Sequence, residues 1–278
     1  MIAPDGAWRD WGGTGPWLHF GHANGFPPGS YRCLLGRLGS CYRTVSLESR
    51  PLWPEGPSPE GLRSWEPLAE DLADTLTDRG LRGILGVGHS LGAVTALMAA
   101  CRDPGLFRAL VLVDPVLFSG PRALLWRGMK RLGLGERTPI VSGALRRRDR
   151  WASREAARQA WRNKPLFRSF RDDCFEAYLD EALAPEEDGT LRLRYPKAWE
   201  AAIFRCTPSN PWDFVRTVPM PVLVLRGEHS DALTRSALRR CAALLPRGEV
   251  REVPGTGHML PLEAPERVAQ AILDFLPR

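Results

Sequence analysis

Hydrophobic residues along the chain form short apolar runs that alternate with segments of helical spacing. In segment 65–79, Leu68, Leu72 and Leu76 recur every four residues and predict an amphipathic helix. Segments of strand length are predicted at 16–21, 43–47, 83–87, 107–113, 220–225 and 249–253, and those at 83–87, 107–113 and 220–225 are the most apolar. Strands that alternate with helices predict the α/β class, with a mainly parallel central sheet flanked by helices. In such sheets, reactive groups gather beyond the carboxyl ends of the strands.

The alternation stops after residue 118 and resumes near residue 213. Between these points the spacing is helical, and Ser153 is placed as the N-cap of one helix. We expect helices at 121–134, 153–163, 165–183 and 197–205, with a turn at 186–189. The chain is therefore expected to divide into a core part (1–118), an inserted helical cap (119–212) and a second core part (213–278). Residues 119–212 are called the cap segment below.

The composition is that of an ordinary globular protein, since 44% of the 278 residues are hydrophobic and 25% are charged. No run approaches the roughly 18 uninterrupted apolar residues of a membrane-spanning helix, and the first residues lack a secretory pattern. Six cysteines are scattered without a C-x-x-C pair, which favours free thiols in a reducing compartment. We therefore expect a cytoplasmic enzyme.

Positive charge is concentrated in the cap segment. Residues 119–171 hold 15 basic and three acidic residues, whereas residues 172–200 hold three basic and nine acidic residues. Two interpretations stay open: the two stretches pair with each other, or the basic stretch attracts anionic substrates or lipid headgroups. No recognised nucleic-acid motif accompanies the arginines, so no nucleic-acid partner is expected.

The most informative stretch is 88–92, which has the sequence G-H-S-L-G and fits the pattern G-x-S-x-G. It lies between an apolar strand-like run and an apolar helix-like segment, which is the context of a nucleophile elbow. The serine of such a turn sits in a strained backbone conformation, and side chains at positions 88 and 92 would collide, which Gly88 and Gly92 avoid. We therefore predict Ser90 as a catalytic nucleophile.

A serine hydroxyl needs a base to take its proton and a carboxylate to orient that base. His258 follows the last predicted strand in a short glycine-containing loop, and is the predicted base. Two aspartates compete for the carboxylate. We favour Asp231, in the loop after 220–225, because it completes the chain order serine, acid, histidine. Asp114, at the end of 107–113, is the alternative, and Glu228 is a third choice.

The reaction also needs two backbone N–H groups that point at the developing oxyanion. One is expected from Leu91, directly after the nucleophile, and the other from Asn24, in the loop after the strand 16–21. Phe26 is expected to line the substrate side of the same loop. His89 is adjacent to the nucleophile and is grouped with Phe26 on the substrate side, as packing or support rather than as the base.

The G-x-S-x-G motif, the loop His22-Ala23-Asn24-Gly25, Asp231 and Gly257-His258 together resemble the α/β-hydrolase superfamily over nearly the whole chain. The resemblance implies the α/β-hydrolase fold, with the cap segment as its helical cap. It also implies serine-hydrolase chemistry through an acyl-enzyme, without a metal or an organic cofactor. Epoxide hydrolases and dehalogenases of the superfamily carry an aspartate at the nucleophile position, so Ser90 disfavours these activities.

We therefore expect a carboxylic-ester hydrolase that acts on a small-molecule ester with an apolar acyl group. Candidate pocket walls are the aromatic residues of the cap segment, namely Trp126, Trp151, Trp161, Trp199 and Phe170. One alternative is a lipase or thioesterase whose basic helix 121–134 meets a lipid surface or an anionic carrier. Another is a hydrolase-like ligand receptor with slow turnover. Whether the chain forms a homodimer is left open.

Overall fold

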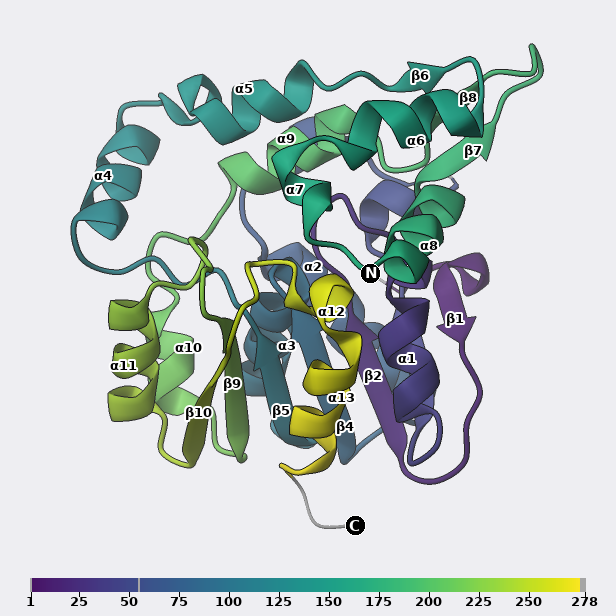
Figure 1. Ribbon diagram of the computed structural model, residues 1–278. Helices are drawn as coiled ribbons and strands as arrows, with labels where there is room; N and C mark the ends of the chain where they lie inside the picture. Colours follow the sequence, from purple (N-terminus) through teal and green to yellow (C-terminus); the bar gives the residue numbers. More distant parts are fainter. Residues whose placement is uncertain (1, 55, 276–278) are drawn as a thin grey trace.

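The computed structural model describes residues 2–54 and 56–275 and contains a central sheet of seven strands (Figure 1). In chain order these are β1 (Trp8–Asp10), β2 (Trp17–Gly21), β3 (Arg43–Leu47), β4 (Ile84–His89), β5 (Phe107–Val113), β9 (Val222–Gly227) and β10 (Gly248–Val253). Their order across the sheet is β1-β3-β2-β4-β5-β9-β10. All neighbours are parallel except β1, which runs antiparallel to β3 at the edge. The predicted α/β class and mainly parallel sheet are confirmed.

Helices cover both faces of the sheet. One face is covered by α1 (Arg32–Leu38), α12 (Leu260–Glu263) and α13 (Pro265–Leu273). The other face is covered by α2 (Glu66–Asp78), α3 (Leu91–Arg102), α10 (Trp212–Thr217) and α11 (Arg235–Leu244). Successive strand residues point to opposite faces, so β5 contributes Val111 to one core cluster and Leu110 and Leu112 to the other.

Most of the cap segment lies across the carboxyl ends of the strands, along the top of Figure 1. Ser153 caps one of its helices as predicted, because its hydroxyl accepts the N–H of Ala156 at 3.1 Å. The helices of this layer are α4 (Gly120–Arg131), α5 (Pro139–Leu145), α6 (Arg154–Arg162), α7 (Pro165–Arg168), α8 (Asp172–Ala182) and α9 (Lys197–Arg205).

Two features of the cap segment differ from the prediction. It contains a small antiparallel sheet of order β6-β8-β7, formed by β6 (Arg150–Trp151), β7 (Leu183–Pro185) and β8 (Leu191–Leu193). Strands of two or three residues are too short to show alternation in the sequence. The single helix expected over 165–183 is divided into α7 and α8. At the break, the N–H of Arg171 donates to the carbonyl of Leu262 in the core at 3.0 Å instead of continuing a helix.

Aromatic side chains fill the interior of the cap segment. The ring centroid of Trp161 lies 4.8 Å from that of Trp151 and 5.3 Å from that of Tyr178. The five predicted pocket walls are all buried: Trp126, Trp151, Trp161, Trp199 and Phe170. Since these side chains pack as core, their contact with a substrate stays a prediction.

Short 3-10 turns connect several elements of the described chain. They are η1 (Asp5–Ala7), η2 (Pro28–Tyr31), η3 (Arg50–Leu52), η4 (Pro59–Gly61) and η5 (Gly135–Arg137). Within residues 2–54 and 56–275, none of the helices combines the length and apolar character needed to cross a bilayer.

Candidate active site

Ser90 occupies the sharp turn between β4 and α3. Its backbone has φ 54° and ψ −110°, and a positive φ is uncommon for a residue with a side chain. The turn is held because the N–H of Ser90 donates to the carbonyl of Val113 on the neighbouring strand at 3.0 Å. The strand–turn–helix context predicted for residues 88–92 is therefore present, with strain at the serine itself.

The two glycines of the motif are required by close backbone contact, as predicted. A Cβ at Gly88 would lie 2.3 Å from the carbonyl oxygen of Gly92. A Cβ at Gly92 would lie 2.2 Å from the carbonyl oxygen of Gly21 on β2. Both distances are far below van der Waals contact, so any side chain at these positions would push α3 away from the sheet.

His258 lies in the loop after β10, with its ring between a hydroxyl and a carboxylate. Its Nε2 is 3.1 Å from the Oγ of Ser90, and its Nδ1 is 2.7 Å from the Oδ2 of Asp114. The histidine side chain is 25% exposed, whereas the aspartate side chain is fully buried. This is the geometry in which a histidine takes a proton from a serine while a carboxylate holds its other nitrogen.

The carboxylate beside His258 therefore belongs to Asp114, and the preference for Asp231 was wrong. Asp114 follows β5 directly and has φ 44°, which turns its side chain into the site. Its carboxylate also accepts hydrogen bonds from the N–H of Gly227, at 3.0 Å, and from the hydroxyl of Ser230. Asp231 is exposed, and its backbone carbonyl accepts from Arg122 at the surface.

Arg226 explains why the loop after β9 turns Asp231 outward. Its guanidinium is buried and donates to the backbone carbonyls of Glu228, Ser230 and Leu233. This wraps the loop around the arginine and places the Ser230 side chain, rather than its neighbour Asp231, against the carboxylate of the site. The prediction missed Arg226 and Ser230. The sequence contained one signal for Arg226, which is that an arginine lies at the carboxyl end of a buried apolar strand.

The loop that follows β2 contains Asn24, the second predicted oxyanion donor. The N–H of Ala23 is already occupied, since it donates to the hydroxyl of Tyr31 at 3.2 Å. Among the hydrogen bonds of the described residues, none uses the backbone N–H of Asn24 or of Leu91. The two N–H groups named from the sequence are thus unoccupied, and their role towards an oxyanion stays a prediction.

The cap segment fixes this loop from above. The Asn24 side-chain amide donates to the carbonyl of Glu200 at 3.0 Å and accepts from the hydroxyl of Tyr195 at 2.9 Å. A Cβ at Gly25, where φ is +79°, would lie 2.8 Å from the carboxylate of Glu200. Glycine is therefore required there both by the backbone conformation and by the cap residue that covers it.

Glu200 forms a buried ion pair with Arg147 of the cap segment. The two side chains are 11% and 16% exposed, and the nearest nitrogen–oxygen distance is 3.1 Å. The guanidinium also donates to the hydroxyl of Tyr178, whose ring centroid lies 4.9 Å from that of Phe26. Phe26 is therefore buried under the aromatic core of the cap segment, and its contact with a substrate stays a prediction.

His89 lies in the interior, as its interpretation as packing or support predicted, and its grouping with Phe26 on the substrate side is not supported. The residue is fully buried. Its Nδ1 is 2.8 Å from the hydroxyl of Tyr31, and its Nε2 is 2.9 Å from the backbone carbonyl of His258. Because that carbonyl can only accept, Nε2 carries the proton and Nδ1 accepts from Tyr31. A continuous buried chain thus joins Ala23, Tyr31, His89 and His258.

Burial holds three histidines near the site in the neutral form. It lowers the pKa of His19 to about 3 because desolvation disfavours the charged ring. Burial likewise lowers the pKa of His22 and, strongly, the pKa of His89. Among the histidines of the described chain, His258 is the one with a ring nitrogen against Ser90.

A cluster of thiol and carboxylate groups lies apart from these residues. Cys33, Asp173 and Cys174 bring three ligand atoms within 4.8 Å of one another where α1 meets α8. The Asp173 carboxylate is already paired with Arg171, and burial raises the pKa of the Cys174 thiol. A paired carboxylate and a protonated thiol make a poor ligand set for a metal ion.

Comparison with known proteins agrees with the observed fold. The chain is 28% identical over 266 residues to 2-(acetamidomethylene)succinate hydrolase of Mesorhizobium japonicum, which covers 95% of this chain and 89% of the relative. A crystal structure of E-2-(acetamidomethylene)succinate hydrolase superposes with a TM-score of 0.80 at 25% identity, covering 96% of this chain and 93% of that one. A marine microorganism esterase shares the fold, with a TM-score of 0.68 at 21% identity over 97% and 98% of the two chains.

The family comparison covers almost the whole molecule. The sequence profile described as the alpha/beta hydrolase family matches residues 13–271, which span every strand of the central sheet except β1. Together with the seven-stranded sheet and the elbow at Ser90, this match shows that the chain is a hydrolase of the alpha/beta hydrolase family.

Proposed function

We propose that this protein is a serine hydrolase that cleaves carboxylic esters through an acyl-enzyme. The observation that carries the proposal is the hydrogen-bonded series from Ser90 through His258 to the buried Asp114. Such a series activates a hydroxyl that is otherwise a weak nucleophile at neutral pH. The strained backbone at Ser90 supports the same role, since strain of this kind clusters at catalytic sites.

The mechanism follows from the positions of these groups. Ser90 Oγ attacks the acyl carbonyl while His258 Nε2 takes its proton, and Asp114 holds the Nδ1–H and stabilises the imidazolium. The N–H groups of Asn24 and Leu91 stabilise the oxyanion. His258 then gives the proton to the leaving alcohol. Water repeats the sequence on the acyl-enzyme and releases the acid.

A lipase or thioesterase would use the same groups on a longer or carrier-bound acyl chain. A slow-turnover receptor would form the acyl-enzyme without releasing it. Hydrolysis of p-nitrophenyl esters of rising acyl length separates these cases. The dependence of the rate on acyl length indicates which acyl chains the site accepts. A burst of p-nitrophenol without steady turnover indicates a receptor. Ser90→Ala must abolish activity. An active Ser90→Ala variant, or a folded wild type inert towards every ester and thioester, would refute the ester proposal.

Hydrolysis of an amide that carries carboxylates is a second candidate. It is favoured by the relative that spans 95% of this chain, whose name denotes an acetamide attached to a succinate. The buried cation of the site, Arg147, is a ready partner for an anionic substrate. We rank this candidate second because Glu200 already neutralises Arg147, so a substrate carboxylate would compete with a buried ion pair. Turnover of N-acetyl amino-acrylate analogues with no turnover of esters would reverse the ranking.

A further inference from the structure

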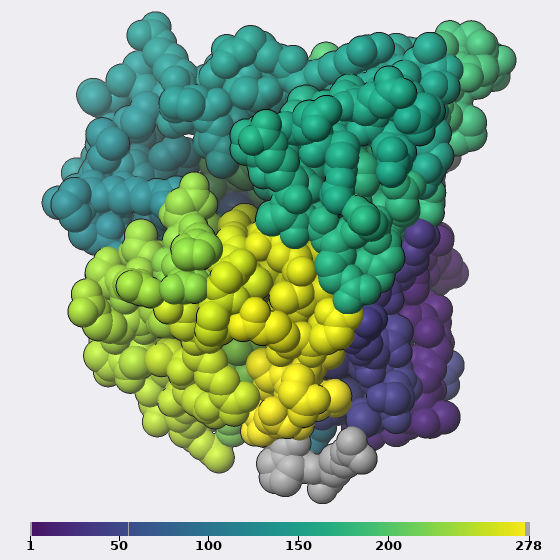
Figure 2. Space-filling view, in the orientation of Figure 1, coloured from purple at the N-terminus to yellow at the C-terminus, as the bar shows by residue number. Residues whose placement is uncertain are grey.

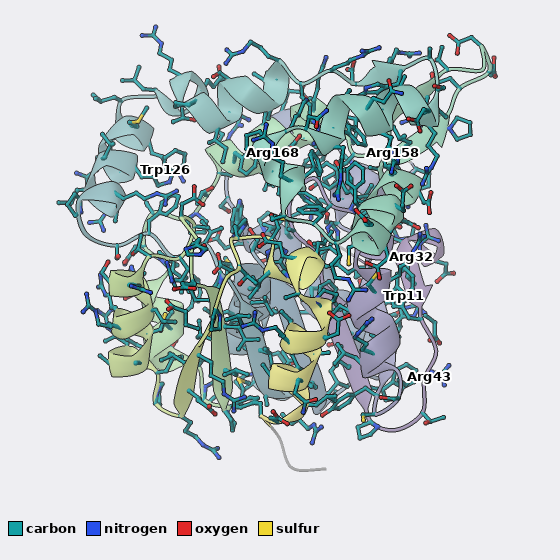
Figure 3. The ribbon with its side chains drawn as sticks, viewed as in Figure 1. Trp11, Arg32, Arg43, Trp126, Arg158 and Arg168 are labelled. Atoms are coloured by element: carbon teal, nitrogen blue, oxygen red, sulfur yellow. The ribbon has the colours of Figure 1, made fainter. Side chains whose placement is uncertain are left out.

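Helix α4 turns its leucines away from the protein. Leu124 and Leu125 are each 66% exposed, and Leu132, directly after the helix, is 73% exposed. These three residues are called the leucine face. The inner side of α4 is formed by Ala123 and Trp126, whose indole N–H donates to the carbonyl of Thr207 at 3.0 Å (Figure 3). A helix that lies against a core normally buries its leucines, so α4 has a second apolar side without a partner.

This helix lies at the margin of the molecule. Figure 1 shows α4 at the far left of the view, beside the ends of the strands and clear of the helices that cover the sheet. In Figure 2 the same segment protrudes from the upper left of the molecule, and the surface is hollowed between it and the C-terminal part of the chain. The leucine face is therefore accessible to a large partner.

The basic residues around the leucine face lack acidic partners. Residues 120–148 contain eight basic residues and one acidic residue, Glu136. Within the part of the chain that the structure describes, Arg147 is the one basic residue of this stretch with a carboxylate at ion-pair distance. The later arginines behave differently, since Arg154 and Arg158 pair with Glu176 on α8. The pairing interpretation of the two charged stretches thus holds for Arg147 with Glu200 and for Arg154 and Arg158 with Glu176, whereas the other basic residues of 120–148 have no carboxylate at ion-pair distance among the described residues.

We propose that the leucine face and the basic residues around it dock on the surface of an anionic lipid bilayer. In such docking the leucines enter the boundary between headgroups and acyl chains. Long basic side chains such as Arg131 and Arg137 reach the lipid phosphates while their apolar stems lie on the membrane. Both are exposed, and the exposed apolar residues Leu132 and Ile140 follow them within three positions in the sequence.

A second copy of the chain fits this surface less well. A two-fold contact through the leucine face would bring the same uncompensated arginines of both copies together, and like charges in contact oppose association. A bilayer with anionic headgroups satisfies both properties of the surface, its positive charge and its exposed leucines. Docking at α4 would hold the protein by the segment that follows the site residue Asp114 in the chain.

The test is flotation of the purified protein with vesicles of phosphatidylcholine alone and with vesicles of phosphatidylcholine and phosphatidylserine in equal amounts. We expect binding to the anionic vesicles, and loss of binding as salt is raised. Leu124→Ser with Leu125→Ser should weaken binding by at least about tenfold. Arg131→Gln with Arg137→Gln should weaken it by roughly fivefold per charge removed.

The matched controls are Leu166→Ser, at an apolar position of α7 that is 47% exposed, and Arg239→Gln, at an exposed position of α11. Both should bind anionic vesicles as wild type does. Circular dichroism and thermal unfolding establish that each variant is folded. The salt dependence of wild-type binding tests the proposal independently of any variant. Absence of binding to anionic vesicles at low salt overturns the proposal, and so does equal loss in the controls. If the vesicles do not bind, a dimer that dissociates on substitution of the leucine face would identify a second copy of the chain as the occupant. Binding of an acidic protein at the leucine face would identify that partner instead.

Discussion

Removal of the Tyr31 hydroxyl tests whether the buried hydrogen-bond chain beside the site is a structural requirement. Tyr31 is 1% exposed, and its hydroxyl accepts from the Ala23 N–H and donates to His89 Nδ1. Tyr31→Phe leaves both of these groups buried without a partner. Each unsatisfied buried group costs about 1–3 kcal/mol. We therefore expect the free energy of unfolding to fall by about 2–4 kcal/mol and the midpoint of thermal unfolding by roughly 5–10 °C.

The assay is urea unfolding followed by circular dichroism, with Tyr42→Phe as the matched control. Tyr42 is also buried, at 5% exposure, but its hydroxyl makes no hydrogen bond to another described residue. The control should therefore change the free energy of unfolding by less than about 0.5 kcal/mol. Because His89 also holds the backbone of His258, Tyr31→Phe should in addition lower kcat more than it changes KM. The reasoning is refuted if the two phenylalanine variants are equally stable.

Two further predictions concern stability. The pKa of His19 is lowered to about 3 in the folded protein, and that of His89 is also lowered. Below pH 6.5 the unfolded chain therefore binds more protons than the folded one. The free energy of unfolding should consequently fall as the pH drops from 6.5 towards 4.5. Urea unfolding at three pH values measures this loss, which should be about 1.4 kcal/mol per pH unit for each histidine that is neutral in the folded protein. A free energy of unfolding that does not change between pH 6.5 and 4.5 would contradict the buried neutral state. Glu200→Gln leaves Arg147 as a buried unpaired cation and should cost about 3 kcal/mol in the same assay. The control Glu249→Gln, in an exposed ion pair, should lower the free energy of unfolding by less than about 1 kcal/mol. Equal losses in Glu200→Gln and Glu249→Gln would mean that burial of the Arg147–Glu200 pair does not raise its contribution to stability.

Local patterns were sufficient for most of the fold and for two members of the site. The predicted strand segments match the parallel strands of the central sheet, and β5 and β9 were the clearest because strands buried on both faces are largely apolar. Ser90 was found because the elbow imposes glycines at fixed positions, and the distances at Gly88 and Gly92 show that requirement directly. His258 was found because it follows a strand at the same edge of the sheet.

The acid of the site could not be found in this way. Asp114 and Asp231 both lie between Ser90 and His258 in the chain, and both follow strands that end beside one another, so chain order fits either. The choice is made by contacts between distant residues, namely the guanidinium of Arg226 in the β9 loop and the positive φ of Asp114. Neither leaves a periodic signal in the sequence.

The partners of His89 were missed for a similar reason. Adjacency to Ser90 in the sequence indicates a position near the site but not the direction of the side chain. The partners of its ring, Tyr31 and the backbone of His258, lie 58 and 169 residues away in the chain. The small sheet of the cap segment was missed because its strands are shorter than the windows in which alternation can be recognised.

The most direct test of the central claim compares Asp114→Asn with Asp231→Asn in the turnover of the best ester of the series. If Asp114 orients His258, its amide variant should lower kcat by roughly 10³–10⁴-fold while remaining folded, as expected for loss of the correct imidazole tautomer. Asp231→Asn should leave kcat within about twofold of wild type, since Asp231 is exposed and the carboxylate on the His258 ring is that of Asp114. Full activity in Asp114→Asn together with a large loss in Asp231→Asn would contradict the account.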